Sequence, residues 1–152
     1  MTREQFLARL DAAWSSFRAS YAGLPEAELL RPGVTGEWSV RDLIAHVTWW
    51  EEEALEHLPV ILAGRRPPRY STTYGGIDAF NALKTKETMG LPLAEILRRQ
   101  EEVHVCVVAL VRGVPESEVA SDTRFRRRLR SDTYGHYPKH TAAILKWREA
   151  RR

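Results

Sequence analysis

Cysteine is nearly absent from this sequence of 152 residues, in which Cys106 is the only one. An internal disulfide is therefore excluded, and a reducing cytoplasm is the expected compartment. Cys106 stands among valines, and this apolar setting predicts a core position rather than a reactive thiolate. Long apolar runs are absent too. None approaches the roughly 18 residues of a membrane span, and no apolar segment of a secretory leader follows the N-terminus. We therefore expect no membrane partner.

Segments in which apolar and polar residues alternate are also missing, so β-strands are not predicted. The chain is 43% hydrophobic and 28% charged, a balance that is typical of soluble globular proteins and that argues against disorder. Its length suits one domain, and we expect a single domain over residues 1–152.

Apolar residues that recur every three or four positions predict amphipathic helices. The first helix begins at the capping-box pair Thr2 and Gln5. The second begins after Ser39, and Pro59 is expected to kink it or end it. A connection rich in proline and glycine, residues 64–76, follows. The remaining expected helices cover residues 77–88, residues 93–111 and the segment around His140. The prediction is an all-α chain with four main helices and one long crossover.

The net charge of +3 is unevenly distributed along the chain. Residues 121–152 contain ten lysines or arginines and three acidic residues, and five of these arginines lie within Arg124–Arg130. Such a run is most often a solvated face or a loop before a helix. It is also able to bind the phosphates of a nucleic acid or to steer an anionic small molecule.

Three histidines are the strongest chemical signal in the sequence. His136 and His140 are four residues apart, so on a helix they share one face. His46 from a facing helix would complete three ligands around an open metal position, as in catalytic metal sites. Asp42 and Glu53 are candidates to orient the imidazoles, or else a helix cap and a surface charge. The plain alternatives are a buried structural histidine and an exposed pair that binds nothing.

Three stretches resemble the DinB-like four-helix-bundle superfamily, and within it the ClbS/DfsB family: residues 36–51, 77–81 and 133–140. The resemblance implies an up-down-down-up four-helix bundle with a long crossover connection, and a homodimer. In many relatives three histidines bind a divalent metal such as zinc or nickel, and by position these are His46, His136 and His140. Relatives include thiol-dependent isomerases and transferases. The ClbS/DfsB branch is named for a protein that opens the cyclopropane of a genotoxin, and that branch is not firmly metal-dependent.

Four further residues are candidates for binding a substrate: Trp50, Asn81, Tyr134 and Tyr137. Trp50 lies one turn after His46, Asn81 lies early in a helix, and the tyrosines flank the histidine pair. Core packing or a helix-start role is the alternative for each of them. The two remaining histidines, His57 and His104, lack partners at a useful spacing and are predicted to be structural or on the surface.

These patterns favour an enzyme that modifies or detoxifies a small molecule, using a metal-activated water or thiol against an electrophilic substrate. A hydrolase and a thiol transferase both fit, and no catalytic residue is assigned. The first alternative is a protein that sequesters a toxic metabolite without turnover, because the same pocket would serve. The second is a nucleic-acid-associated protein that uses Arg124–Arg130.

Overall fold

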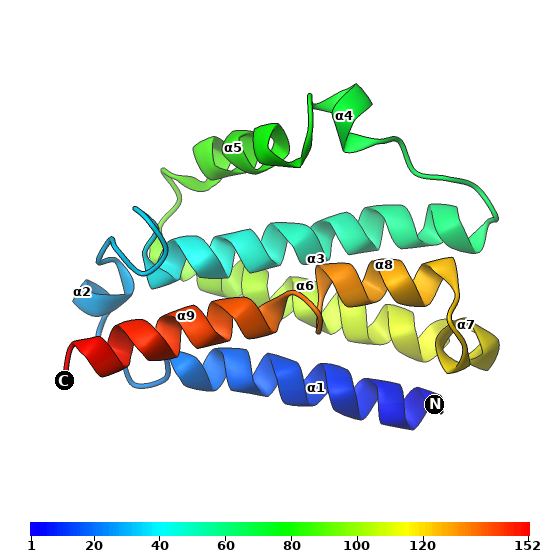
Figure 1. Ribbon diagram of the computed structural model, residues 1–152, viewed down its shortest axis with the longest axis horizontal. Coiled ribbons are helices and arrows are strands. Elements are labelled where there is room, and N and C mark those ends of the chain that lie inside the picture. Colours follow the sequence, from blue (N-terminus) through cyan, green and yellow to red (C-terminus); the bar gives the residue numbers. More distant parts are fainter.

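The computed structural model describes residues 1–152 and contains helices and no strands, as the sequence predicts. Figure 1 shows a bundle of four rods, with α5 and α4 lying along the outer side of α3. The helices are α1 (Arg3–Ser20), α2 (Glu26–Leu29), α3 (Val40–Leu62), α4 (Tyr70–Thr73), α5 (Ile77–Thr88), α6 (Leu93–Gly113), α7 (Glu116–Ala120), α8 (Arg124–Asp132) and α9 (Tyr137–Ala150). None of them combines the length and the apolar character that crossing a membrane requires.

The four rods run up, down, down and up (Figure 1). The first three are α1, α3 and α6, and α8 and α9 together form the fourth. Because α3 and α6 run in the same direction, the chain must return along the bundle between them, and the segment with α4 and α5 makes this return. α3 packs against α6, α8 and α5, whereas α1 packs mainly against α9. α3 is therefore the element that connects the bundle to its outer cover.

The helix starts follow from local hydrogen bonding. Thr2 and Gln5 form a capping box at α1, and Ser39 and Asp42 form another at α3. Pro59 does not end α3, which continues to Leu62. A proline inside a helix removes one hydrogen bond, and here the surrounding packing outweighs that loss.

The Arg124–Arg130 segment is helical, so the loop that was one alternative is not formed. Phe125 and Leu129, four residues apart, are fully buried and fix the inner face of α8. A turn at Gly135 then separates α8 from α9, and the N–H of Gly135 donates to the carbonyl of Arg130 at 2.9 Å. A Cβ at position 135 would lie 2.7 Å from that oxygen, so only glycine allows this turn. The turn sets where α9 starts.

Cys106 is exposed, and the core position expected for it is wrong. Val105 beside it is 64% exposed, whereas His104, Val107 and Val111 are buried. The helical period explains the difference, because these three buried residues share one face of α6 and the intervening residues face solvent. An apolar neighbourhood in sequence is not an apolar neighbourhood in space.

Candidate metal centre

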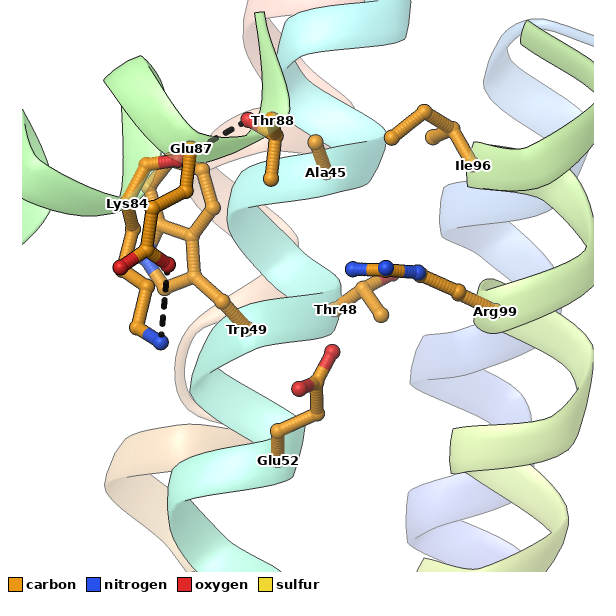
Figure 2. A pocket seen from close by; sticks show the side chains of 9 residues that line it. All are labelled: Ala45, Thr48, Trp49, Glu52, Lys84, Glu87, Thr88, Ile96 and Arg99. Carbon is orange, nitrogen blue, oxygen red and sulfur yellow. Dashed lines mark hydrogen bonds and ion pairs between the residues drawn. The ribbon is translucent and has the colours of Figure 1, made fainter. Parts of the chain in front are cut away.

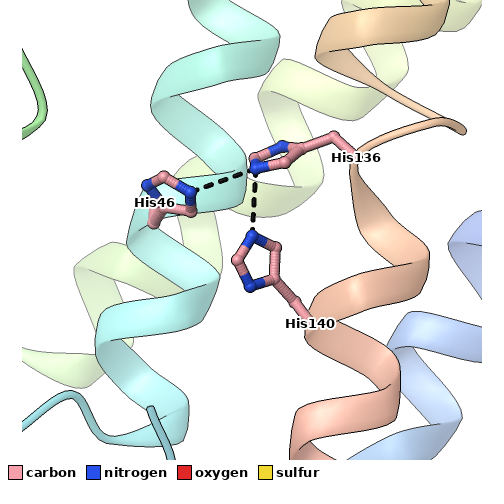
Figure 3. Close-up of side chains that lie close together, drawn as sticks. All are labelled: His46, His136 and His140. Atoms are coloured by element: carbon pink, nitrogen blue, oxygen red, sulfur yellow. Dashed lines mark hydrogen bonds between the residues drawn. The ribbon is translucent and has the colours of Figure 1, made fainter. Parts of the chain in front are cut away.

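The three predicted histidines meet at one point between α3 and α9 (Figure 3). His46 projects from the second turn of α3, His136 is the N-cap residue of α9, and His140 lies one turn later. The Nε2 atom of His136 is 3.0 Å from that of His46 and 3.0 Å from that of His140. The spacing of four residues and the facing helix therefore bring the three side chains together as expected.

Pro138 does not disturb this arrangement, although it stands between the two histidines of α9. It lies in the first turn of the helix, where its missing N–H has no helical partner to lose. Its fixed φ suits a helix start. His136 and His140 therefore share one face without a break in the helix.

All three imidazoles are neutral near pH 7. Burial lowers the pKa of His46 to about 2, and the imidazoles of His136 and His140 lower it further. Burial and then His136 lower the pKa of His140 to about 3. Burial and then Lys139 lower the pKa of His136 to about 4. Each ring therefore offers a nitrogen lone pair instead of a positive charge, which is the form that binds metals.

The donor set fits a divalent cation. Neutral imidazole has one N–H, and the Nδ1 atoms of His46 and His136 are buried without a hydrogen-bond partner. With hydrogens on Nδ1, three Nε2 lone pairs face one another and repel. A cation among them would remove that repulsion. Nitrogen ligands about 2.1 Å from a metal lie about 3.0 Å apart at right angles and about 3.4 Å apart at the tetrahedral angle. The two Nε2–Nε2 separations of 3.0 Å are therefore close to those of nitrogens that share one metal ion.

Tryptophans surround the histidine cluster. The ring of Trp38 lies 4.9 Å from that of His46, and Trp49 meets His46 edge-on at 5.0 Å. Trp50, which the sequence predicts to bind substrate, lies 6.5 Å from His136. Sequence reasoning missed Trp38, which precedes a helix cap and belongs to no periodic stripe. Aromatic rings therefore pack against the cluster on the side of His46 and His136.

Asn81 of α5, a predicted substrate-binding residue, holds two of these rings. Its side-chain oxygen accepts hydrogen bonds from the indole N–H of Trp50 at 2.9 Å and from that of Trp49 at 3.1 Å. Trp38 and Asn81 also line an open groove of about 780 Å³ along α5. The groove therefore reaches Trp38, whose ring lies beside His46.

The two candidate tyrosines face α1 rather than the histidines. Tyr134 packs edge-to-face on Phe6 at 5.4 Å. Tyr137 is fully buried, with its ring 5.4 Å from Trp14 and 6.2 Å from Phe17. Their neighbours are therefore core aromatics.

The carboxylates that are candidates to orient the imidazoles bind other groups. Asp42 caps α3 and pairs with Arg41 at 3.1 Å. Glu53 accepts the hydroxyl of Tyr70 at 2.8 Å and so fixes the crossover segment. Neither contacts a histidine of the triad. Asp42 is the helix cap that was its alternative, whereas Glu53 is buried and is not a surface charge. His57 pairs with Glu53 at 3.3 Å, so the expectation that it lacks a partner at a useful spacing is wrong.

A second, smaller cavity lies between α3, α5 and α6 (Figure 2). Charged side chains of both signs line it: Glu52, Lys84, Glu87 and Arg99. Its volume of about 40 Å³ holds on the order of three water molecules. It is therefore too small for an organic substrate.

The arginines of α8 are largely used inside the protein. Arg128 pairs with Asp132 at 2.7 Å and donates to the Tyr70 hydroxyl at 2.8 Å. Arg124 donates to the carbonyl of Arg65 at 3.3 Å. Burial raises the pKa of Asp132 to about 6, against the opposing effect of Arg128. This helix is therefore tied to the crossover rather than presented as one free basic face.

The family follows from the sequence as a whole. The sequence model of the DinB superfamily matches residues 9–147. The chain belongs to the DinB superfamily. Proteins of this superfamily often bind divalent metals, and the histidine cluster of this member has the geometry for one. No curated protein matches the sequence.

Solved structures share the fold of this DinB superfamily member at low identity. An uncharacterised protein from Escherichia coli UTI89 aligns with a TM-score of 0.82 and 16% identity, over 99% of this chain and 94% of its own. DfsB, described as a sibling lethal factor precursor, aligns with a TM-score of 0.81 and 13% identity, over 100% of this chain and 98% of DfsB. The colibactin self-resistance protein ClbS, solved with double-stranded DNA, aligns with a TM-score of 0.80 and 16% identity, over 97% and 96%. These matches confirm the resemblance in fold.

Proposed function

We propose that His46, His136 and His140 bind one divalent metal ion, zinc or nickel, and that the protein is an enzyme acting on a small electrophilic molecule. The observation that carries the proposal is the convergence of three neutral imidazoles whose Nε2 atoms face one another at 3.0 Å. A bound metal would supply a positive charge that makes a coordinated water or thiol more acidic. Hydrolysis and thiol transfer are the two reaction types that this chemistry serves.

The surrounding residues have a separate part in the proposal. The rings of Trp38, Trp49 and Trp50 exclude bulk water, which strengthens electrostatic interactions at the histidines. Asn81 holds two of these rings in place, and it does so with an oxygen that is already occupied. We therefore assign Asn81 a positioning role. The substrate would enter along the groove between Trp38 and α5, which suits a molecule with an apolar body.

The test uses the full chain and two histidine variants. His140→Ala removes a ligand, whereas His57→Ala removes a half-buried histidine of the Glu53 pair. Titration with zinc, followed by calorimetry, is expected to show one tight site in the wild-type protein and in His57→Ala. The zinc affinity of this site should be at least 100-fold weaker in His140→Ala. Equal zinc affinity in all three proteins would rule the site out.

A sequestering protein remains the second candidate, because ClbS is described as a self-resistance protein. In that case the same groove would hold a toxic small molecule without turnover. Protection of cells that saturates at one toxic molecule per protein chain would support sequestration. Protection against a large molar excess of the toxic molecule over the protein would support the enzyme.

Binding to nucleic acid is the third candidate, because ClbS was solved with double-stranded DNA. Two arginines of α8 are exposed to solvent: Arg130, and Arg127, which also pairs with Asp122 at 3.2 Å. DNA binding through them predicts an affinity that falls steeply between low and physiological salt. If an Arg127→Ser/Arg130→Ser variant binds duplex DNA as the wild type does, this use of α8 is wrong.

A further inference from the structure

A buried carboxylate–histidine pair lies outside the histidine triad. Glu51 of α3 is fully buried, and its Oε2 atom is 2.8 Å from Nδ1 of His104 on α6. The ring of His104 stacks on Trp14 of α1, with ring centres 3.8 Å apart and planes 6° apart. Three helices therefore hold one imidazole, and its orientation is fixed by both a hydrogen bond and a stacked face.

The hydrogen bond also fixes which nitrogen of His104 is free. Because Glu51 accepts a hydrogen from Nδ1, the Nε2 atom carries the lone pair in the neutral ring. Nε2 has no hydrogen-bond partner in the protein and is not among the buried, unpaired polar atoms. His104 lines an open groove of about 600 Å³ between α1 and α6. The free nitrogen is thus the one that reaches solvent.

The groove combines an apolar floor with a charged edge. Trp14, Tyr21 and Val108 line it beside His104. An ion pair between Arg18 and Glu101 at 2.9 Å joins the two helices along it. A small molecule with an apolar body would bury surface against the rings and place a polar group next to His104.

Glu51 is a costly residue to bury for structure alone. Burial raises its pKa, and the hydrogen bond to His104 opposes that rise. Its second oxygen, Oε1, and the buried hydroxyl of Tyr137 make no hydrogen bond of standard geometry, but the two side chains lie close enough to interact. Burial and the neighbouring Glu51 carboxylate raise the pKa of Tyr137 well above its ordinary value. Burying a carboxylate costs free energy even when it is hydrogen-bonded, which makes this pair a candidate for a functional role.

We propose that Glu51 and His104 form a second reactive site, separate from the histidine triad, in which Nε2 of His104 attacks activated esters with an apolar body. The pair has the elements of nucleophilic catalysis: an exposed lone pair, a ring held in one orientation and a carboxylate on the opposite nitrogen. No metal takes part in it.

The reaction proceeds in two balanced steps. The Nε2 lone pair forms a bond to the carbonyl carbon, and the carbon–oxygen bond to the leaving alcohol breaks. The Nδ1 hydrogen passes to Glu51, which leaves a neutral acyl-imidazole. A water molecule then attacks the carbonyl carbon, the nitrogen–carbon bond breaks, and the carboxylic acid leaves with one proton of the water. The second proton of the water passes through solvent to the alkoxide that left in the first step. Nδ1 takes its hydrogen back from Glu51, so the sum is ester plus water to acid plus alcohol.

The test is cleavage of p-nitrophenyl acetate by the full chain in the presence of EDTA, which removes any contribution from a metal. We expect the wild-type protein to exceed free imidazole at equal concentration by at least 10-fold. His104→Gln should lose this excess. Glu51→Gln, which keeps an acceptor for Nδ1–H, should retain part of it. His57→Gln replaces another carboxylate-paired histidine and should behave as the wild type.

Circular dichroism checks whether His104→Gln folds. If it does not, trapping the acyl-imidazole in the wild-type protein tests the proposal instead. Wild-type protein quenched in acid during turnover is expected to carry an acetyl group on His104, located by mass spectrometry of its peptides. A rate no higher than that of free imidazole would overturn the proposal. So would an acetyl group found only on other residues. Failure of zinc binding at the triad would leave these results unchanged, so the two proposals are tested independently.

Discussion

At the scale of single residues, the triad is a cluster of neutral imidazoles whose burial disfavours their protonated form. His46, with a pKa lowered to about 2, is the extreme case, because burial and two neighbouring imidazoles act in the same direction. The unfolded chain has no such environment, and its histidines titrate near their ordinary value of about 6.5. This difference between the folded and unfolded states is measurable as a pH dependence of stability.

The metal-free protein is predicted to lose stability on acidification from pH 7 to pH 5. The pKa values of His46, His136 and His140 in the folded state are about 2, 4 and 3. Below pH 6.5 the unfolded state therefore binds more protons, and the free energy of unfolding falls with falling pH. Each histidine contributes up to about 2 kcal/mol over this range. Urea denaturation at several pH values in EDTA measures this free energy of unfolding. Its dependence on pH should be shallower in His140→Ala than in the wild-type protein. An equal slope would contradict the burial of a neutral His140.

Gly135 is predicted to control the position of His136. In Gly135→Ala the new Cβ would meet the backbone oxygen of Arg130 at 2.7 Å, so the turn between α8 and α9 must shift. We expect a loss of about 1–3 kcal/mol of stability and weaker zinc binding. Gly90→Ala is the matched control, because a Cβ there has no atom within 4 Å. Thermal denaturation and zinc titration of both variants test this. Unchanged zinc affinity in Gly135→Ala would show that the turn does not set the site.

At the scale of elements, the sequence was informative where a local rule decides the structure. The expected helix at residues 77–88 coincides with α5 (Ile77–Thr88), and both capping boxes are present. The local rules were less informative where packing between helices decides. α3 continues through Pro59, α8 forms in a segment rich in arginine, and Cys106 faces solvent. The pattern at each of these positions was compatible with two outcomes, and only the neighbouring helices select one.

The cover formed by α5 is predicted to depend on Asn81. Asn81→Ala leaves the indole N–H groups of Trp49 and Trp50 without their acceptor, at a cost of about 1–3 kcal/mol. Asn81→Asp retains an acceptor oxygen and should lose less. Hydrogen exchange should become faster across residues 77–88 in Asn81→Ala. If exchange there is the same in all three proteins, the two indole hydrogen bonds do not hold α5.

At the scale of the whole molecule, the bundle order determines which residues meet. α3 faces α9 on one side and α6 on another, so one helix supplies both His46 and Glu51. The histidine triad was predictable, because a spacing of four residues and a resemblance to a known family both point to it. The pair of Glu51 and His104 was not, because it joins residues from two parallel helices whose relative rotation has no signature in the sequence. Trp38 was missed because it lies before the start of α3, outside any periodic pattern.

The most direct measurement is the metal content of the protein purified without an affinity tag or chelator, by elemental analysis, with His140→Ala beside it. The account predicts about one equivalent of zinc or nickel in the wild-type protein and a large loss in the variant. Absence of metal from the wild-type protein, persisting after reconstitution with zinc, nickel and manganese, would contradict it. A metal that stays in His140→Ala would place the binding site elsewhere.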